Sequence, residues 1–139
     1  MGTLIDTRAA YELCKSRGYE PLVDRRFPME IRLRIQVQRE LFGTGHTPEE
    51  NEKFYRWCWN HYPPICAECM RPLRNYSAVY VSHILTRGAH PEMAHDPRNV
   101  NILCPAHHAV WENGDREGMR IYRSNQHIIE LLKNEYQNL

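Results

Sequence analysis

Hydrophobic and polar positions predict helices in the N-terminal part of this chain. Residues 6–17 have a helix-compatible pattern, with Asp6 or Thr7 as the cap and Gly18 as the stop. Residues 30–38 are ambiguous, because their apolar positions alternate as in a strand while their arginine and glutamine content favours a helix. The alternating residues are Ile31, Leu33, Ile35 and Val37. We favour the helix for this segment.

A third helix is predicted just before the middle of the chain. Thr47-Pro-Glu-Glu50 has the form of a capping box with proline at the first helical position. The helix should continue to about Asn60 and end before Pro63-Pro64. The expected packing face comprises Phe54, Trp57 and Trp59.

Beyond residue 62 the pattern changes to short strands. Residues 78–84 and 100–103 are strand-like, and residues 105–113 are helical with Gly114 as the stop. Asn125 could cap a last helix with an apolar face. That face would contain Ile128, Ile129, Leu131, Leu132 and Tyr136. We therefore predict an α+β fold, with a mostly helical N-terminal extension over residues 1–62 and a second domain over residues 63–139.

Composition narrows the class of protein only slightly. The chain has 139 residues, of which 42% are apolar and 25% charged, as in ordinary soluble domains. We find neither a secretory signal nor a membrane-spanning stretch, so we expect a cytoplasmic protein with no membrane partner. The net charge of +1 gives no argument for nucleic-acid binding. Arginines do gather in two segments, and these matter only if a catalytic site lies nearby. They are Arg25, Arg26, Arg32, Arg34 and Arg39 in the first, and Arg71, Arg74, Arg87 and Arg98 in the second.

Cysteine spacing predicts a structural zinc site. Cys66-Ala-Glu-Cys69 is one half-site, and Cys104-Pro-Ala-His107 is a second, farther along the chain. Zinc prefers four tetrahedral thiolate and imidazole ligands, and a separation of two residues lets both side chains of a pair reach one ion. We expect Zn²⁺ bound by Cys66, Cys69, Cys104 and His107. The alternative is buried thiols beside unrelated histidines.

The same segment resembles the HNH endonuclease family, which has the ββα-metal fold. The match covers residues 66–112: the CxxC pair, then a strand with His83-Ile84, then Asn99-Val-Asn-Ile-Leu-Cys104 and His108 after the second half-site. Arg87-Gly-Ala-His-Pro91 is also similar to the loop of phage NinG-type recombination nucleases, which suggests a phage or mobile-element origin. Residues 1–62 match no family that we can name.

The resemblance implies roles for three residues. His83 would be the general base, because a neutral imidazole can activate water at pH 7. His108 would bind a catalytic Mg²⁺ or another divalent ion, which stabilises the charge that develops on the scissile phosphate. Asn99 would orient the loop and the base, or bind the ion itself.

One position departs from the family pattern. Many members have Asp or a second His before the strand histidine, and this chain has Ser82. A serine hydroxyl is a poorer ligand for a hard ion than a carboxylate is. Either the ion affinity is low, or activity is impaired, or a loop residue supplies the missing ligand. The loop candidates are His90, His95 and Asp96.

These observations predict a metal-dependent endonuclease that hydrolyses DNA phosphodiester bonds. Ser82 makes one alternative credible, a non-enzymatic zinc module that binds nucleic acid. A second alternative is a protein-interaction domain in which the zinc site is only a scaffold. The combination of His83, Asn99 and His108 favours the enzyme, because neither alternative requires all three residues.

Overall fold

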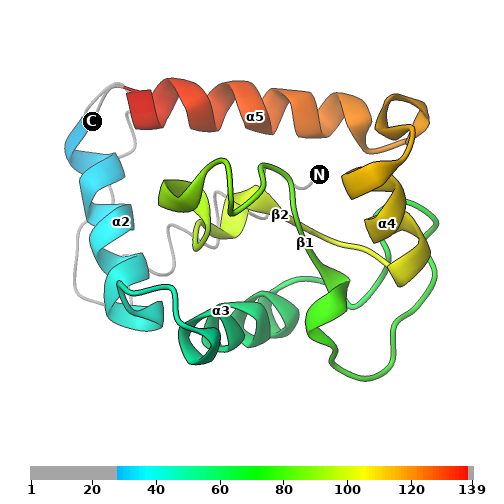
Figure 1. The fold of residues 1–139 in the computed structure, drawn as a ribbon, viewed down its shortest axis with the longest axis horizontal. Helices are drawn as coiled ribbons and strands as arrows, with labels where there is room; N and C mark the ends of the chain where they lie inside the picture. The colour runs from blue at the N-terminus through cyan, green and yellow to red at the C-terminus, as the bar shows by residue number, and fades with distance from the viewer. Residues whose placement is uncertain (1–27, 138–139) are drawn as a thin grey trace.

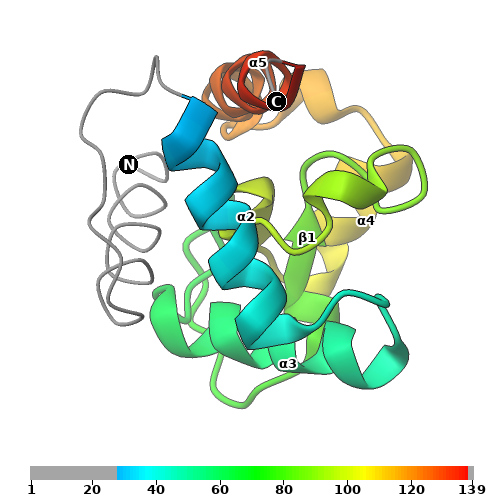
Figure 2. The same ribbon diagram turned by 90° about the vertical axis from the view of Figure 1, so that its left-hand side faces the viewer.

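The computed structural model describes residues 28–137, so the helix predicted over residues 6–17 lies outside the described residues. Within them the fold is α+β, with a two-stranded antiparallel sheet and four α-helices. The elements are α2 (Pro28–Phe42), α3 (Pro48–His61), β1 (Val81–His83), β2 (Val100–Ile102), α4 (Pro105–Asn113) and α5 (Tyr122–Gln137). The sheet lies between α3 and α5, while α2 and α4 occupy opposite ends of the molecule (Figures 1 and 2).

Local signals set the two helices that precede the sheet. The ambiguous segment at residues 30–38 is helical, within α2. The capping box before α3 is present: the Glu50 N–H donates to the Thr47 hydroxyl at 3.2 Å, and the Thr47 N–H donates to the Glu50 carboxylate at 3.0 Å. The helix ends at His61, before Pro63-Pro64, as predicted.

The first strand is shorter than the predicted span of residues 78–84. Residues 78–80 form a 3₁₀ turn instead, because the Ser77 hydroxyl accepts a bond from the Val79 N–H and caps this turn. The strand that follows pairs Ser82 with Asn101 and His83 with Val100. The sheet is therefore a minimal one, and its two strands are held by the elements packed around them.

The last two helices confirm one prediction and correct another. Helix α4 spans Pro105–Asn113 with Gly114 as its C-cap, as expected. Asn125 does not cap α5, which begins at Tyr122 and buries Asn125 in its second turn. Its amide group exchanges hydrogen bonds with Asn101 of β2, at 2.8 and 3.2 Å, so a tertiary partner replaced the capping role.

Residues on both sides of position 62 contribute to one hydrophobic core. Phe54 and Cys58 of α3 lie in the same buried cluster as Ile102 of β2, Trp111 of α4 and Leu132 of α5. The division of the chain at residue 62 stays a prediction. No helix among residues 28–137 is both long enough and apolar enough to cross a membrane.

Candidate functional site

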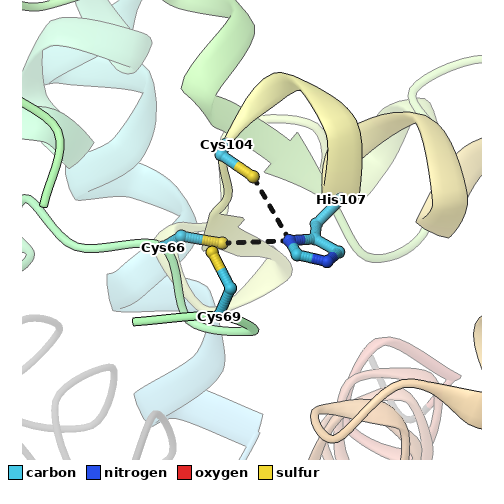
Figure 3. A group of neighbouring side chains, drawn as sticks. All are labelled: Cys66, Cys69, Cys104 and His107. Atoms are coloured by element: carbon cyan, nitrogen blue, oxygen red, sulfur yellow. Dashed lines mark hydrogen bonds between the residues drawn. The ribbon is translucent and has the colours of Figure 1, made fainter. Parts of the chain in front are cut away.

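Four side chains from the two predicted half-sites converge on one point (Figure 3). The ligand atoms of Cys66, Cys69, Cys104 and His107 all lie within 4.8 Å of one another. The Nδ1 atom of His107 is 3.2 Å from the Cys104 sulfur and 3.7 Å from the Cys66 sulfur. A sulfur and a nitrogen bound to one tetrahedral zinc ion are about 3.6 Å apart, from ordinary bond lengths. The cluster can hold a metal ion, and its donor set is compatible with zinc.

Short backbone interactions position both half-sites. Cys66 and Cys69 lie on a tight turn in which the Met70 N–H donates to the Cys66 carbonyl at 2.8 Å and Met70 has a φ of 65°. The neighbouring Ala67 N–H donates to the Ile102 carbonyl of β2 at 2.8 Å. Cys104 is the N-cap of α4, which carries His107 on its first turn. Both halves of the cluster are thus attached to β2.

The environment of the cluster favours a thiolate at Cys66. Burial acts to raise the pKa of this thiol, but hydrogen bonds from three backbone N–H groups and from His107 lower it to about 6. These N–H groups belong to Cys69, Cys104 and Glu68. Burial raises the pKa of the Cys104 thiol. Because metals bind thiolates rather than thiols, Cys66 is ready to take the first position around an ion at neutral pH.

His83 is the last residue of β1 and is almost completely buried. In its neutral ring one nitrogen donates a hydrogen bond and the other has a lone pair. Its Nε2 atom is 2.8 Å from the Ala94 carbonyl. A carbonyl only accepts, so Nε2 donates, and the lone pair of the neutral ring is on Nδ1. Among residues 28–137 nothing hydrogen-bonds to Nδ1. Burial lowers the pKa of His83, and the positive charge of Arg87 lowers it further.

His108 lies close to His83 and forms a pair with Glu112. Its Nδ1 donates to the Val79 carbonyl at 2.6 Å, so Nε2 has the lone pair of the neutral ring. Nε2 is 2.9 Å from a Glu112 carboxylate oxygen, one helical turn farther along α4. Two electron-rich atoms at this distance need a proton or a cation between them. Oxygen and nitrogen ligands in adjacent positions of an octahedral ion lie about 3.0 Å apart, so the pair also suits a metal ion.

Glu112 was not identified from the sequence as a candidate site residue. The signal was its position four residues after His108, which places both side chains on one face of a helix. Helix α4 holds this face against β1 at two points. His108 bonds to Val79 just before the strand, and the Trp111 indole N–H donates to the Ile84 carbonyl just after it, at 3.2 Å.

Asn99 organises the loop that carries His83's partner. Its side-chain oxygen accepts from the Leu85 N–H at 2.8 Å, and its amide nitrogen donates to the carbonyls of Leu85 and Met93 at 2.9 and 3.2 Å. The residue is fully buried. These bonds fix both ends of the loop between β1 and β2, directly beside Ala94, whose carbonyl orients His83. The Asn99 amide group is thus bonded to the loop at three points, and its role in the site stays a prediction.

The three loop candidates do not point toward His83 and His108 as a group. Both oxygens of Asp96 are bonded, to the guanidinium of Arg98 and to the Tyr136 hydroxyl. His90 lies 3.4 Å from Glu92 at the other end of the loop. His95 is buried and bonds to Asn51 of α3. None of the three joins the pair on α4.

Ser82 and Arg98 are also buried. Ser82 pairs with Asn101, whose side chain faces α5, so Ser82 is on the face of the sheet opposite His83. Arg98 is only 3% exposed and forms ion pairs with Asp96 and Glu135 at 2.9 and 2.6 Å. Of the second group of arginines, Arg71, Arg74 and Arg87 remain exposed and Arg98 is part of the interior. A bound nucleic acid could therefore contact the first three but not Arg98.

Comparison of the chain with family models, with curated proteins and with solved structures finds no match in any of the three. The function must therefore be argued from the geometry of these two groups of side chains, the Cys66 cluster and the set around His83 and His108.

Proposed function

We propose that this protein is a metal-dependent endonuclease of the HNH type that hydrolyses phosphodiester bonds in DNA. The observation that carries the proposal is the state of His83, a buried neutral imidazole with Nε2 committed to a carbonyl and Nδ1 left as an acceptor. A general base needs this state, with an available lone pair at neutral pH and a fixed ring orientation. In this role His83 Nδ1 accepts a proton from the attacking water.

The cluster of Cys66, Cys69, Cys104 and His107 is assigned to structural Zn²⁺. Three thiols and one imidazole complete the tetrahedral set, which leaves no position open for substrate. The site joins the Cys66 turn to the start of α4, and so positions His108 on the helix that follows. Its role is to hold the sheet and α4 together.

The pair of His108 and Glu112 is assigned to a catalytic divalent ion, Mg²⁺ or a similar metal. When bound, such an ion stabilises negative charge on the scissile phosphate and the leaving oxygen. The Val79 carbonyl fixes the His108 ring so that Nε2 faces the carboxylate, which is the usual support for a metal-binding histidine. In this proposal Glu112 supplies the carboxylate ligand that Ser82 cannot supply.

Substrate binding is assigned to the exposed side of this site. Arg87 lies near enough for its charge to lower the pKa of His83, and its side chain is exposed. An exposed guanidinium beside the base can bind a phosphate of the DNA backbone. Arg71 and Arg74 add exposed positive charge elsewhere on the surface.

The proposal is tested by plasmid nicking with Mg²⁺, Mn²⁺ or Ni²⁺, with an EDTA control. We expect divalent-dependent cleavage, and a loss of about 10²–10⁴-fold in His83→Ala, because a general base contributes this much to the rate. His127→Ala, a change of an exposed histidine on α5, is the matched control and should cleave like the parent.

Two results would contradict the proposal. Equal cleavage by His83→Ala and the parent would remove the catalytic assignment. If no divalent ion supports cleavage while the zinc-containing protein still binds DNA, the non-enzymatic zinc module is the correct function.

A further inference from the structure

A second group of histidines lies around a cavity of about 200 Å³, beside the site described above, and Phe54 stacks on both His83 and His95. The cavity is formed between the end of α2, the loop before α3, the turn at Glu92 and the end of α5. His46, His95 and Glu92 line it, and His83 and His108 are not among its lining residues. Histidine rings that share a cavity are candidates for ligand binding.

His95 presents an unused lone pair. The residue is 4% exposed, and its Nδ1 has no hydrogen-bond partner among the described residues. Its Nε2 is 2.8 Å from the side-chain oxygen of Asn51. The Asn51 amide nitrogen, in turn, is 3.4 Å from the His46 carbonyl, which assigns the amide oxygen to His95. Nε2 therefore donates to Asn51, and the lone pair of the neutral ring is on Nδ1.

The Nδ1 of His95, which has no partner within residues 28–137, destabilises the fold, but the bond from Nε2 to Asn51 is typical of a metal-binding histidine. A buried nitrogen that lacks a partner destabilises the fold, because it has lost its bonds to water without replacement. A histidine that binds a metal typically donates its other ring N–H to a carbonyl or carboxylate, which fixes the tautomer and the ring orientation. Asn51 gives His95 this support, and Phe54 stacks on the ring with centroids 5.2 Å apart. The ring is held in place with its Nδ1 prepared for an electron-pair acceptor.

His46 brings a second imidazole to the same place. Its ring centroid is 4.5 Å from that of His95, at an interplanar angle of 75°. Its backbone has a φ of 51°, a left-handed conformation that glycine adopts without steric cost and other residues rarely adopt. The segment Gly43-Thr-Gly45 precedes it, so glycine is used nearby but not at this position. A strained residue is retained here, and its ring lies against that of His95.

We propose that the imidazoles of His95 and His46 form a second metal site, for a borderline transition-metal ion such as Ni²⁺ or Zn²⁺. Imidazole nitrogens are the preferred ligands of these ions, and Ni²⁺ binds them more tightly than Mn²⁺ or Fe²⁺. Glu92 lines the same cavity and adds negative charge to it, while its carboxylate lies 3.4 Å from His90. The site joins the loop before α3 to the loop between the two strands.

The experiment measures nickel binding to the full, zinc-containing chain. A His108→Ala background removes the ion site proposed on α4, so that only the new site is counted. The protein is dialysed against NiCl₂, and nickel and zinc per chain are measured by elemental analysis, with affinity from calorimetry. We expect one nickel ion in addition to the retained zinc. Loss of cleavage in this background has no bearing on the result, so the two proposals fail separately.

Three variants test the ligands. His46→Gly should lose the added nickel while its thermal stability stays equal or rises, since glycine relieves the left-handed strain. Asn51→Ala should weaken nickel binding by roughly 10–100-fold, and Asn51→Asp should preserve it, because a carboxylate also accepts from Nε2. His95→Phe should lose the ion and keep the ring packing against Phe54. His61→Ala, an exposed histidine on α3, is the matched control.

The proposal is overturned if the His108→Ala protein binds no nickel beyond exchange at the cysteine cluster, since His95 Nδ1 would then be a buried atom that takes no ion. It is also overturned if His46→Gly binds nickel as tightly as its parent. Should His95→Phe fail to fold, the exposed His46 and its glycine variant still decide the question.

Discussion

The Cys66 cluster and the group around His83 and His108 differ in what holds their side chains in place. In the Cys66 cluster the four ligand atoms lie within 4.8 Å of one another. Around His83 and His108 each ring already has a backbone carbonyl as a partner, from Ala94 and Val79. The first group has the arrangement that an ion would complete, whereas the rings of the second are held by hydrogen bonds to the backbone.

This difference indicates which part of the molecule needs metal in order to fold. The sheet has three residues in each strand, too little to be stable alone. The Cys66 cluster joins the Ile102 end of the sheet to the Cys66 turn and to α4, so an ion bound there would supply stability directly. The His83 and His108 side chains are positioned by hydrogen bonds that do not involve an ion, so an ion bound by His108 could exchange without unfolding the chain.

The largest expected effect is therefore at the cysteines. Cys66→Ser or Cys104→Ser should unfold the protein, because structural zinc contributes about 10–16 kcal/mol in small domains and a whole domain is stable by only about 5–15 kcal/mol. Circular dichroism and elemental analysis measure the loss of structure and of zinc together. Purified parent protein should contain about one zinc ion per chain.

Cys58→Ala is the matched control, since this thiol is buried in α3 outside the cluster. It should keep zinc and lose only about 1 kcal/mol of stability. A folded Cys66→Ser protein with a normal melting temperature would show that the ion is not a structural one.

The second effect concerns the face of the sheet opposite the base. Ser82→Asp would introduce a carboxylate at a fully buried position whose present hydroxyl has no hydrogen-bond partner among the described residues. Burial of an unpaired charge costs several kcal/mol, so we expect a loss of about 3–5 kcal/mol in urea unfolding at pH 7. Ser82→Ala should be neutral or stabilising. If Ser82→Asp instead stays stable and lowers the metal requirement, the side chain reaches the ion and the pairing register is wrong.

Sequence reasoning succeeded where the relevant interactions are local. The Cys66 and Cys104 half-sites each depend on a spacing of two residues, and the Thr47 capping box depends on a spacing of three. Such patterns are visible in the chain because neighbours in sequence are neighbours in space. The α+β class and the extent of α4 followed from the same kind of signal.

The errors arose where a distant residue decides the structure. Asn125 has the composition of a cap, but its amide pairs with Asn101 across the fold. The burial of Arg98 was likewise not predicted, because it depends on ion pairs with Asp96 and with the distant Glu135. Ser82 could not be assigned to the far face of the sheet until its partner in β2 was known. Spacing alone does not report such contacts.

The third effect is on metal affinity rather than on folding. Glu112→Gln should raise the Mg²⁺ or Mn²⁺ concentration for half-maximal cleavage by at least about tenfold, because an amide is a weaker ligand than a carboxylate. The fold should persist, since His108 keeps its bond to Val79. Glu130→Gln, at an exposed carboxylate of α5, is the control. An unchanged metal requirement in Glu112→Gln would exclude this carboxylate from the site.

The smallest effect is on the pH dependence of cleavage, and it tests the base directly. Burial and the charge of Arg87 lower the pKa of His83 below its ordinary value of about 6.5. The base works when neutral, so kcat/KM should stay on its plateau down to pH 6.5 and fall only below it. The same shift weakens the fold as pH falls below about 6.5, because the unfolded chain then binds protons that the buried ring does not. Circular dichroism at each pH separates this loss from the catalytic one.

Arg87→Gln makes the test specific. Removal of this positive charge should raise the pKa of His83, so the acid limb of the profile should move upward by a fraction of a pH unit. Arg71→Gln removes an exposed charge that does not act on His83, and its limb should coincide with that of the parent. High salt should reduce the difference between Arg87→Gln and the parent, because ions screen exposed charges. If the acid limb of the kcat/KM profile lies above pH 6.5, or if it does not move in Arg87→Gln, a group other than His83 accepts the proton.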